Sequence, residues 1–331
     1  MFRSRRVAVV LCSLALAAFI CAEAVARLLL GLGDPPLFMA DPKIEYLNKP
    51  GHYHRFGHIV HVNQWSMRSP DFPEHKAAAG ELRVLVIGDS VVNGGAKLDN
   101  SEVATSLFAL DLAKATGRTT IVGNISAGSW GPPNQLAYIQ KYGTFDADAV
   151  IIVWSSHDAW DIPGFGPFGF DQPTEKPLFA SYEAFRRYAI PMVFPPPSES
   201  PPHTQKDVDD GVLAARELLQ LIQSKHIPVA VILHKTQVEL KGKDLEGDRL
   251  LGAAAESLGV PVFQTASLFG PELQKGSSVF FDDIHPNAAG NRLLAGLYMQ
   301  VATQLLSREA APSASPRAPT VPAAIPVPAP K

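Results

Sequence analysis

The stretch LRVLVIGDS (residues 82–90) decides the fold that this sequence predicts. It is a short, mainly apolar run that stops at Gly88 and Asp89, directly before a serine. An apolar run of this length, bounded by glycine, is typical of a buried strand. We expect a strand over Leu82–Ile87 that delivers the hydroxyl of Ser90 to its carboxyl end, where open α/β sheets bind their ligands.

Beyond this strand, apolar runs alternate with segments of helical spacing. We expect further strands at Thr119–Ile125, Ala147–Trp154, Val229–Leu233 and Val260–Phe263, and helices at Ser101–Ala115, Pro132–Tyr142, Asp207–Ser224, Leu245–Leu258 and Pro286–Leu306. Strands that are apolar throughout and alternate with helices favour a parallel sheet covered on both faces. The sequence therefore predicts an α/β domain with a central parallel sheet of about five strands.

The length of 331 residues suits one large domain with appendages. We place that domain at residues 81–308, with an insertion at 162–206 rich in Pro, Gly and Phe. An irregular extension and linker, 33–80, precede it. The segment 309–331 is mainly Ala, Pro and Ser, and we expect a disordered tail there because such a composition cannot bury a core.

The N-terminal segment, 1–32, has the composition of an export signal. Arg3, Arg5 and Arg6 precede the apolar run Val7–Ala22, which predicts a signal-anchor helix or a cleaved signal peptide. A buried core helix fits the arginine flank poorly. We favour the anchor, a single span with the basic end in the cytoplasm and the following domain exported across the inner membrane to the periplasmic side.

Composition and charge exclude several classes of function. The net charge of −3 offers no basic footprint for nucleic acid. The two cysteines, Cys12 and Cys21, both lie in the apolar N-terminal run, which excludes a disulfide framework and a thiolate metal site. Four histidines within residues 52–61 could form a metal cluster, but no acidic ligand pattern accompanies them, so a solvated or substrate-facing loop is favoured. We expect no metal and no cofactor.

A second motif near the end of the chain complements Ser90. Asp282 stands three residues before His285, a spacing that lets a carboxylate hold one ring nitrogen while the other faces a serine. A serine hydroxyl needs such a base to become a nucleophile. The alternatives are a surface turn that starts a helix for the second motif, a helix cap for Ser90 or Asp89, and Asp283 as the orienting acid.

Taken together, these segments resemble the SGNH/GDSL hydrolase family over roughly Leu82–Leu306. Gly88-Asp89-Ser90 matches its first block, Asn124-Ile-Ser-Ala-Gly128 its second, and Asp282–His285 its last. The resemblance implies a flavodoxin-like three-layer α/β/α domain that hydrolyses esters or thioesters. It also implies an oxyanion hole that includes the backbone N–H groups of Ser90 and Gly128. Some members transfer or remove acetyl groups on polysaccharides.

One block departs from the family pattern. Where the family has an asparagine whose amide donates to the oxyanion, this chain has His157, within Ser155-Ser156-His157-Asp158. A neutral imidazole N–H could donate instead, held by Asp158. The alternatives are a structural histidine and a degenerate site. We expect Asp89, Asn124 and Asp158 to support the site without reacting.

Two further signals are open. Arg68, in a segment that resembles the N-terminal extension of exported members, could bind an anionic group, although packing of this segment is favoured. Trp130, Trp154 and Trp160 could form a platform for sugars, but aromatic residues at strand ends more often belong to the core.

The sequence therefore predicts an exported, membrane-tethered serine esterase in which Ser90, His285 and Asp282 act together. Its substrate would be an acylated small molecule or polysaccharide, with acetyl esters of the cell envelope as one option. The alternatives are an O-acetyltransferase of exopolysaccharide assembly, with the same residues, and a non-catalytic glycan-binding module on the same fold.

Overall fold

The computed structural model describes residues 2–195, 202–243 and 245–310. The expected tail therefore lies, from residue 311 onward, outside the described residues. A five-stranded parallel sheet forms the centre of the molecule, in the order β6-β5-β7-β8-β9. The strands are β5 (Leu82–Gly88), β6 (Thr120–Ser126), β7 (Ala149–Ser155), β8 (Val229–His234) and β9 (Val262–Gln264).

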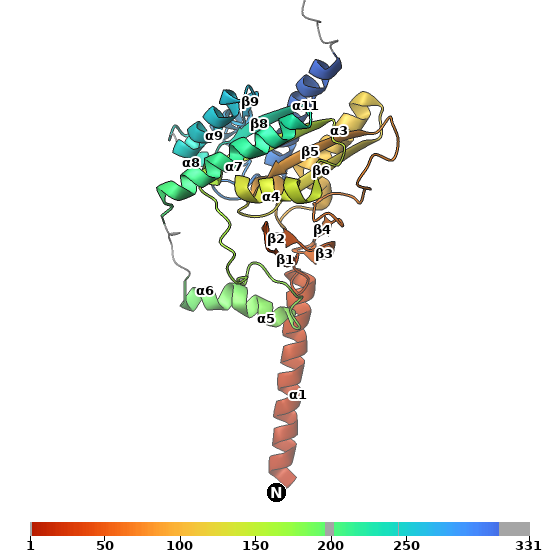
Figure 1. Ribbon diagram of the computed structural model, residues 1–331. Coiled ribbons are helices and arrows are strands. Elements are labelled where there is room, and N and C mark those ends of the chain that lie inside the picture. Colours follow the sequence, from red (N-terminus) through yellow and green to blue (C-terminus); the bar gives the residue numbers. More distant parts are fainter. Residues whose placement is uncertain (1, 196–201, 244, 311–331) are drawn as a thin grey trace, which may run out of the picture.

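Helices cover both faces of this sheet (Figure 1). One face packs against α4 (Pro132–Tyr142), α7 (Gln205–Ser224) and α9 (Glu246–Ser257), and the other against α3 (Ala104–Thr116) and α11 (Ala288–Ala310). Side chains alternate between the two cores because successive strand residues point to opposite faces. Leu85 and Ile87 of β5 enter the first core, whereas Val84 and Val86 enter the second. The predicted three-layer α/β/α architecture is confirmed.

The strand order locates the ligand-binding edge of the sheet. The chain starts in β5, crosses to β6 on one side and then to β7 on the other. Open α/β sheets bind ligands at the carboxyl ends of the strands where the order reverses in this way. Ser90 follows β5 and His157 follows β7, so the sheet delivers both to that point.

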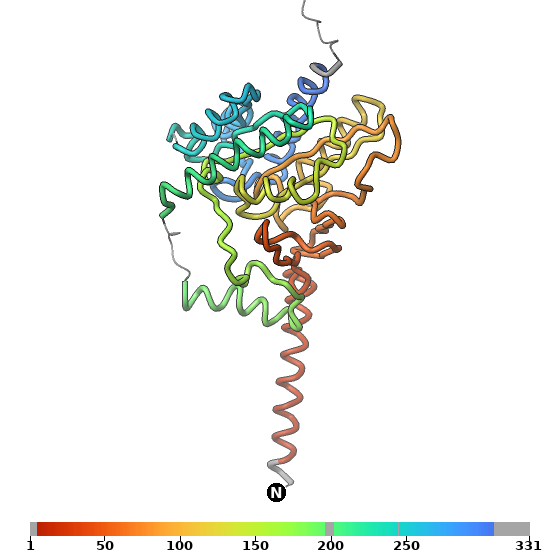
Figure 2. Tube along the Cα trace, in the orientation of Figure 1, coloured from red at the N-terminus to blue at the C-terminus, as the bar shows by residue number. Residues whose placement is uncertain are grey.

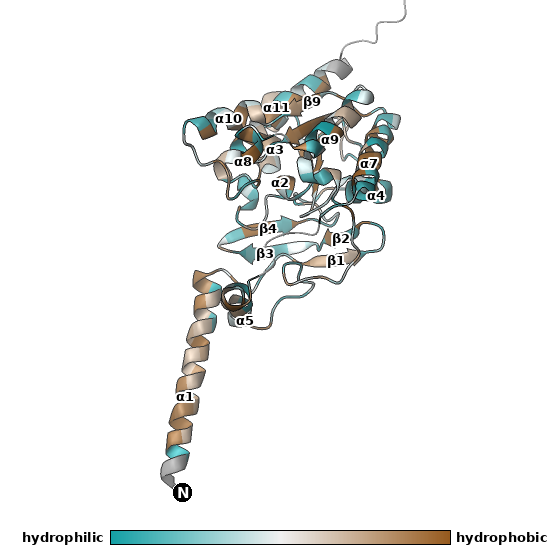
Figure 3. Ribbon diagram, turned by 90° about the vertical axis from the view of Figure 1, so that its left-hand side faces the viewer, coloured by the Kyte–Doolittle hydropathy of each residue, from teal (hydrophilic) through white to brown (hydrophobic). Residues whose placement is uncertain are grey.

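The N-terminal extension is more regular than the sequence indicated. It forms two antiparallel hairpins, β1 (Phe38–Asp41) with β2 (Glu45–Asn48), and β3 (Gly51–Arg55) with β4 (His58–Val62). The sequence predicted only an irregular extension, because these strands are short and lack regular alternation. The hairpins lie between the sheet domain and α1 (Figure 3). They contact the carboxyl edge of the sheet, where the side-chain amide of Asn48 donates to the Ser126 carbonyl at 2.8 Å.

The N-terminal helix α1 (Phe2–Ala24) continues into a π-helical turn, η1 (Val25–Leu29). Within the described residues, one helix, Arg5–Leu29, is long and apolar enough to cross a membrane. It projects away from the rest of the molecule (Figure 2). The insertion, for which no helix was predicted, contains α5 (Ala180–Ala184), η4 (Phe185–Ala189) and α6 (Ile190–Val193).

In the part of the chain that the structure describes, five short helices complete the fold: α2 (Ser90–Asn93), η2 (Asn100–Glu102), η3 (Ser156–Ala159), α8 (Gln237–Leu240) and α10 (Ala266–Gln274). Two of them, α2 and η3, directly follow the strands β5 and β7 at the switch point.

Candidate active site

The loop after β5 places Ser90 at the first position of α2. A Cβ at Gly88 would lie 2.5 Å from a methyl of Val92 and 2.9 Å from the Val153 carbonyl oxygen, so only glycine fits this turn. The carboxylate of Asp89 accepts the backbone N–H of Val91 at 2.8 Å and so caps α2. The residue before the serine therefore fixes the helix that presents it.

The structure brings His285 and Asp282 to this serine. His285 Nε2 lies 2.9 Å from Ser90 Oγ, and its Nδ1 lies 2.9 Å from Asp282 Oδ2. Asp282 Oδ1 also accepts the backbone N–H groups of Ile284 and His285, at 3.0 and 2.9 Å. Burial alone would raise the pKa of Asp282, but these hydrogen bonds outweigh it and lower the pKa, so this carboxylate stays ionised beside the imidazole.

A buried histidine that the sequence analysis missed supports this arrangement. His234, the last residue of β8, donates from Nε2 to the carbonyl of Ile284 at 2.9 Å. This bond ties the loop that carries His285 to the end of a central strand. Burial lowers the pKa of His234, so the ring is neutral. The sequence showed only a polar residue at a strand end, which could not reveal its partner 50 positions away.

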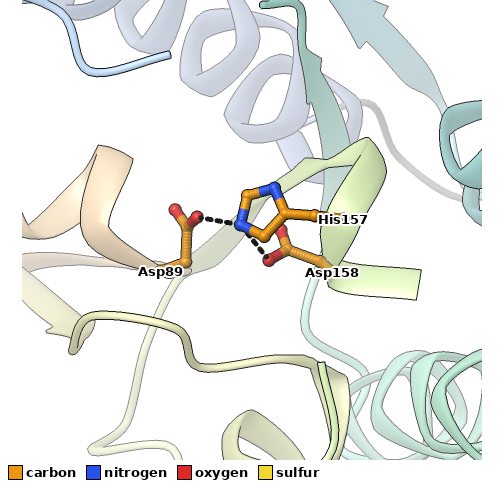
Figure 4. Close-up of side chains that lie close together, drawn as sticks. All are labelled: Asp89, His157 and Asp158. Atoms are coloured by element: carbon orange, nitrogen blue, oxygen red, sulfur yellow. Dashed lines mark ion pairs between the residues drawn. The ribbon is translucent and has the colours of Figure 1, made fainter. Parts of the chain in front are cut away.

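His157 lies among three carboxylates. Its Nε2 is 3.2 Å from Asp89 Oδ2, 3.5 Å from Asp158 Oδ1 and 3.6 Å from Asp161 Oδ2. Figure 4 shows the first two pairs, with the other ring nitrogen, Nδ1, directed away from both carboxylates. Asp158, expected to hold this ring, does so less closely than Asp89. Its other oxygen accepts the backbone N–H of Ser155 at 2.7 Å.

This environment corrects the expected charge of His157. Burial would lower its pKa, but the carboxylates of Asp158, Asp89 and Asp161 outweigh burial and raise the pKa to about 10. The ring is thus an imidazolium at neutral pH, not the neutral imidazole that the sequence analysis assumed. The contact with the charged ring of His157 lowers the pKa of Asp89 against its burial.

The other two carboxyl groups of the cluster, Asp158 and Asp161, ionise less readily than usual. Burial and the charge of Asp89 raise the pKa of Asp158 well above its usual range. Burial, together with Asp89, also raises the pKa of Asp161 to about 6. Like charges at this distance disfavour full ionisation of the cluster, and Asp89 forms its closest ion pair with His157.

Asn124 lies near the end of β6 and Gly128 just after this strand, and the two residues have different roles. The Tyr46 hydroxyl, from β2, donates to the Gly128 carbonyl, and a Cβ at Gly128 would have no atom within 4 Å. Space is therefore open above this residue. The side-chain amide of Asn124 is instead buried and donates to the Val92 carbonyl at 2.8 Å and to Thr105 Oγ1 at 2.9 Å. Asn124 supports α2 from behind.

Arg68 and the tryptophans, for which the sequence left a binding role open, have structural roles. Arg68 is buried, and its guanidinium donates to the carbonyls of Asn93, Gly95 and Leu98 in the loop after α2. It has no free face for an anionic ligand. Trp130 and Trp154 are also buried in the core, which argues against a platform for sugars. Trp160, half-buried, stacks on His203 with ring centroids 4.1 Å apart.

The four histidines of residues 52–61 lie on the β3–β4 hairpin. Two of them, His52 and His61, stack with ring centroids 4.2 Å apart. Among the described residues, the group of side chains close enough to share a metal ion is Asp89, His157 and Asp158. In the structure these three residues contact one another as ion pairs centred on His157.

The family model of the GDSL-like Lipase/Acylhydrolase family matches residues 86–293, which is most of the sheet domain. The chain belongs to this family. The GDSL-like lipases and acylhydrolases are ester-bond hydrolases, and the predicted resemblance to the SGNH/GDSL hydrolases is confirmed.

Solved structures with a similar fold include several esterases. A two-domain esterase active on acetylated mannans, co-crystallised with mannopentaose, matches with 15% identity and a TM-score of 0.46 over 69% of this chain and 51% of that chain. This GDSL-like chain thus spans about half of that protein. LAE5, from the metagenome of Lake Arreo, matches with 18% identity and a TM-score of 0.45, over 71% and 99% of the two chains.

A catalytic mutant of Axe2, an acetylxylan esterase from Geobacillus stearothermophilus, matches with 16% identity and a TM-score of 0.42, over 66% of this chain and 93% of that chain. No curated protein matches the sequence. Family membership therefore rests on the family model and on the motifs, not on these distant structural likenesses.

Proposed function

We propose that this GDSL-like protein is an exported serine esterase that cleaves acyl esters, with acetyl esters on cell-envelope polysaccharide as the substrate class. The observation that carries the proposal is the hydrogen-bonded series Ser90–His285–Asp282, with distances of 2.9 Å at both steps. A serine, a base and an orienting acid in this order are the components of nucleophilic acyl transfer.

In the proposed reaction, Ser90 Oγ attacks the carbonyl carbon of the ester while His285 Nε2 takes the hydroxyl proton. The ester C–O bond then breaks, and His285 returns the proton to the departing alcohol oxygen. Water attacks the acyl-serine in the second half, again giving a proton to His285, and the carboxylic acid leaves as Ser90 recovers its proton. Asp282 holds the imidazole and stabilises its charged form.

The negative oxygen of the tetrahedral intermediate needs donors at the same edge of the sheet. We assign the backbone N–H groups of Ser90 and Gly128 to this role, together with His157. The open space above Gly128 is compatible with a bound oxyanion. Because the His157 ring is charged, its Nδ1–H would supply a positive donor in place of the neutral amide of the family pattern.

We further propose that Arg5–Leu29 anchors the protein as a single span in the inner membrane, with the esterase domain on the periplasmic side. Basic residues precede the span, and the positive-inside rule then keeps the N-terminus in the cytoplasm. A reporter enzyme fused after Leu306 should be active only in the exported compartment. Activity of the fusion in the cytoplasm would contradict this orientation.

The function is tested with the full chain in detergent, incubated with acetylated xylan or mannan and with p-nitrophenyl esters of increasing chain length. Release of free acetate, lost in Ser90→Ala, is the expected result. Transfer of the acetyl group to an added oligosaccharide without release would favour the O-acetyltransferase alternative. Unchanged esters under all conditions would contradict the proposal.

A further inference from the structure

The helical segment Ala180–Val193 of the insertion carries an unusual row of exposed apolar side chains. Large apolar residues recur along it and just before it at three- and four-residue intervals, which places them on one side of a helix. They are exposed to solvent in the structure, from 47% for Tyr188 to 85% for Met192; the row consists of Leu178, Tyr182, Phe185, Tyr188 and Met192. We call this row the apolar stripe.

The opposite side of the same segment is fixed to the protein. Ala180 and Glu183 are buried, and the Glu183 carboxylate accepts the backbone N–H of Gly33 at 2.8 Å and pairs with the buried guanidinium of Arg55. These bonds hold the segment against the hairpin β3–β4 and the chain after η1. The apolar stripe is therefore not the inner face of a displaced core helix, since the inner face is already occupied.

The start of the segment is joined to the membrane helix. The carboxylate of Glu23, in the last turns of α1, accepts the backbone N–H groups of Ala180 and Ser181 at 3.0 and 2.9 Å. The ring of Phe19 packs edge-to-face on Phe179, with centroids 5.2 Å apart. Glu23 is thus the cap of α5, which explains an acidic residue at this depth of an apolar helix.

The direction of the segment matches that of a bilayer surface. Figures 1 and 2 show α5 and α6 running crosswise to α1, beside its carboxyl-terminal turns. A span of about 20 residues crosses the hydrocarbon core. If the core begins near Val7, Glu23 and the start of α5 lie close to its outer boundary. Tyrosine and phenylalanine, which make up much of the apolar stripe, suit this boundary, where tyrosine is enriched.

We propose that the segment Ala180–Val193 lies in the headgroup region of the same bilayer that α1 spans, with the apolar stripe against the acyl chains. The occupant of this surface is membrane lipid. This inference rests on the proposed anchoring of α1 and goes beyond it: the protein would contact the membrane at two joined elements instead of one. Amphipathic helices bind in this manner by burying their apolar face at the acyl boundary.

The second contact has a consequence for the active site. A single spanning helix leaves the attached domain free to tilt, whereas a spanning helix and a surface helix together fix its orientation. The hairpins that contact the carboxyl edge of the sheet also lie on the side of α1, so this edge would be held toward the membrane (Figures 1 and 3).

The test uses the full chain with Cys12→Ser and Cys21→Ser, reconstituted in vesicles of phosphatidylethanolamine and phosphatidylglycerol. A single cysteine replaces Met192 and carries an environment-sensitive fluorophore. The matched control is Leu110→Cys on α3, another exposed apolar residue, 67% exposed and on the sheet domain. A third label, at Leu16→Cys, reports independently whether α1 is in the bilayer.

At position 192 the label should emit at shorter wavelength than at 110. Lipids with a nitroxide near the headgroup should remove most of its fluorescence, while aqueous iodide should quench mainly the label at 110. Equal iodide quenching at 192 and 110, with the label at 16 quenched by lipid, would overturn the surface helix but leave the anchor. Loss of lipid quenching at 16 would overturn the anchor and this inference together. Neither outcome bears on ester hydrolysis, which is measured separately.

Discussion

Nε2 of His157 lies 3.2 Å from Oδ2 of Asp89, the residue whose carboxylate also caps the helix that starts with the candidate nucleophile. One carboxylate therefore connects the loop after β5 with the loop after β7. The family pattern has a neutral amide at the position of His157, and a neutral group would leave Asp89 without a cation. Histidine in place of the family's asparagine therefore supplies the cation that pairs with Asp89.

The charge of His157 can be measured directly. Because its pKa is raised to about 10, both ring nitrogens should carry protons at pH 8. Nitrogen chemical shifts of the histidine side chains are followed from roughly pH 5 to pH 11, a range that brackets the ordinary histidine pKa of about 6.5. The His157 ring should lose its proton at the highest pH of the histidines that are assigned. The substitution Asp89→Asn should lower the pKa of His157. A His157 ring that is already neutral at pH 8 would refute the ion pair.

The raised pKa of His157 should also make the stability of the protein depend on pH. A histidine whose pKa is raised in the folded state stabilises that state fully below its unfolded pKa of about 6.5, and this contribution is lost as pH rises toward about 10. The free energy of unfolding should therefore differ most between the parent and His157→Gln at pH values up to about 6.5. The difference should shrink as pH approaches 10. Denaturant titrations of both proteins measure it, and a constant difference would argue against the shifted pKa.

Replacing His157 tests its role in catalysis. His157→Ala should reduce turnover by about 10²–10³-fold with little change in KM if the ring donates to the oxyanion. His157→Asn, which restores the amide of the family pattern, should retain much more activity than the alanine variant. Turnover is expressed per folded molecule, because both variants leave Asp89 without a cation and should also melt earlier. A lower melting temperature with normal turnover would assign His157 a structural role alone.

Asp282 and Asp283 provide a matched pair of substitutions. Asp282 contacts Nδ1 of His285, whereas the contact found for Asp283 is made by its backbone carbonyl, which accepts from Gln237. Asp282→Asn should lower kcat by about 10³–10⁴-fold by favouring the wrong tautomer of the imidazole. Asp283→Asn should have a small effect. Steady-state kinetics of the two variants would reject the assignment if their order were reversed.

Arg68 is expected to matter through the loop that it holds. Arg68→Met removes the donors to three carbonyls of residues 93–98, and each buried acceptor left unpaired costs roughly 1–3 kcal/mol. The variant should unfold at lower denaturant concentration and lose turnover. Unchanged stability, measured by denaturant unfolding, would show that these carbonyls find other partners.

Much of this molecule could be predicted from local patterns. The apolar runs predicted the parallel sheet because strands buried on both faces leave no polar positions to interrupt them. The glycine and serine at the end of β5, and the acid three residues before His285, predicted which side chains would meet. In each case a short segment of sequence contained the physical requirement.

Other features depend on partners far apart in the chain. The charge of His157 depends on Asp89, which follows a different strand, and the role of His234 depends on the carbonyl of Ile284. The hairpins of the extension are too short to show a period of their own. The helix at Ala180 was hidden because its cap, Glu23, belongs to the N-terminal helix, more than 150 residues earlier.

The central claim is that Ser90 is the nucleophile, and covalent labelling tests it most directly. The full chain is treated with a fluorophosphonate, and the adduct is located by mass spectrometry of its peptides, with Ser90→Ala as the matched control. We expect one adduct on Ser90, formed because His285 takes the hydroxyl proton, and none in the variant. Labelling that persists in Ser90→Ala, or a parent protein that never reacts, would contradict the account.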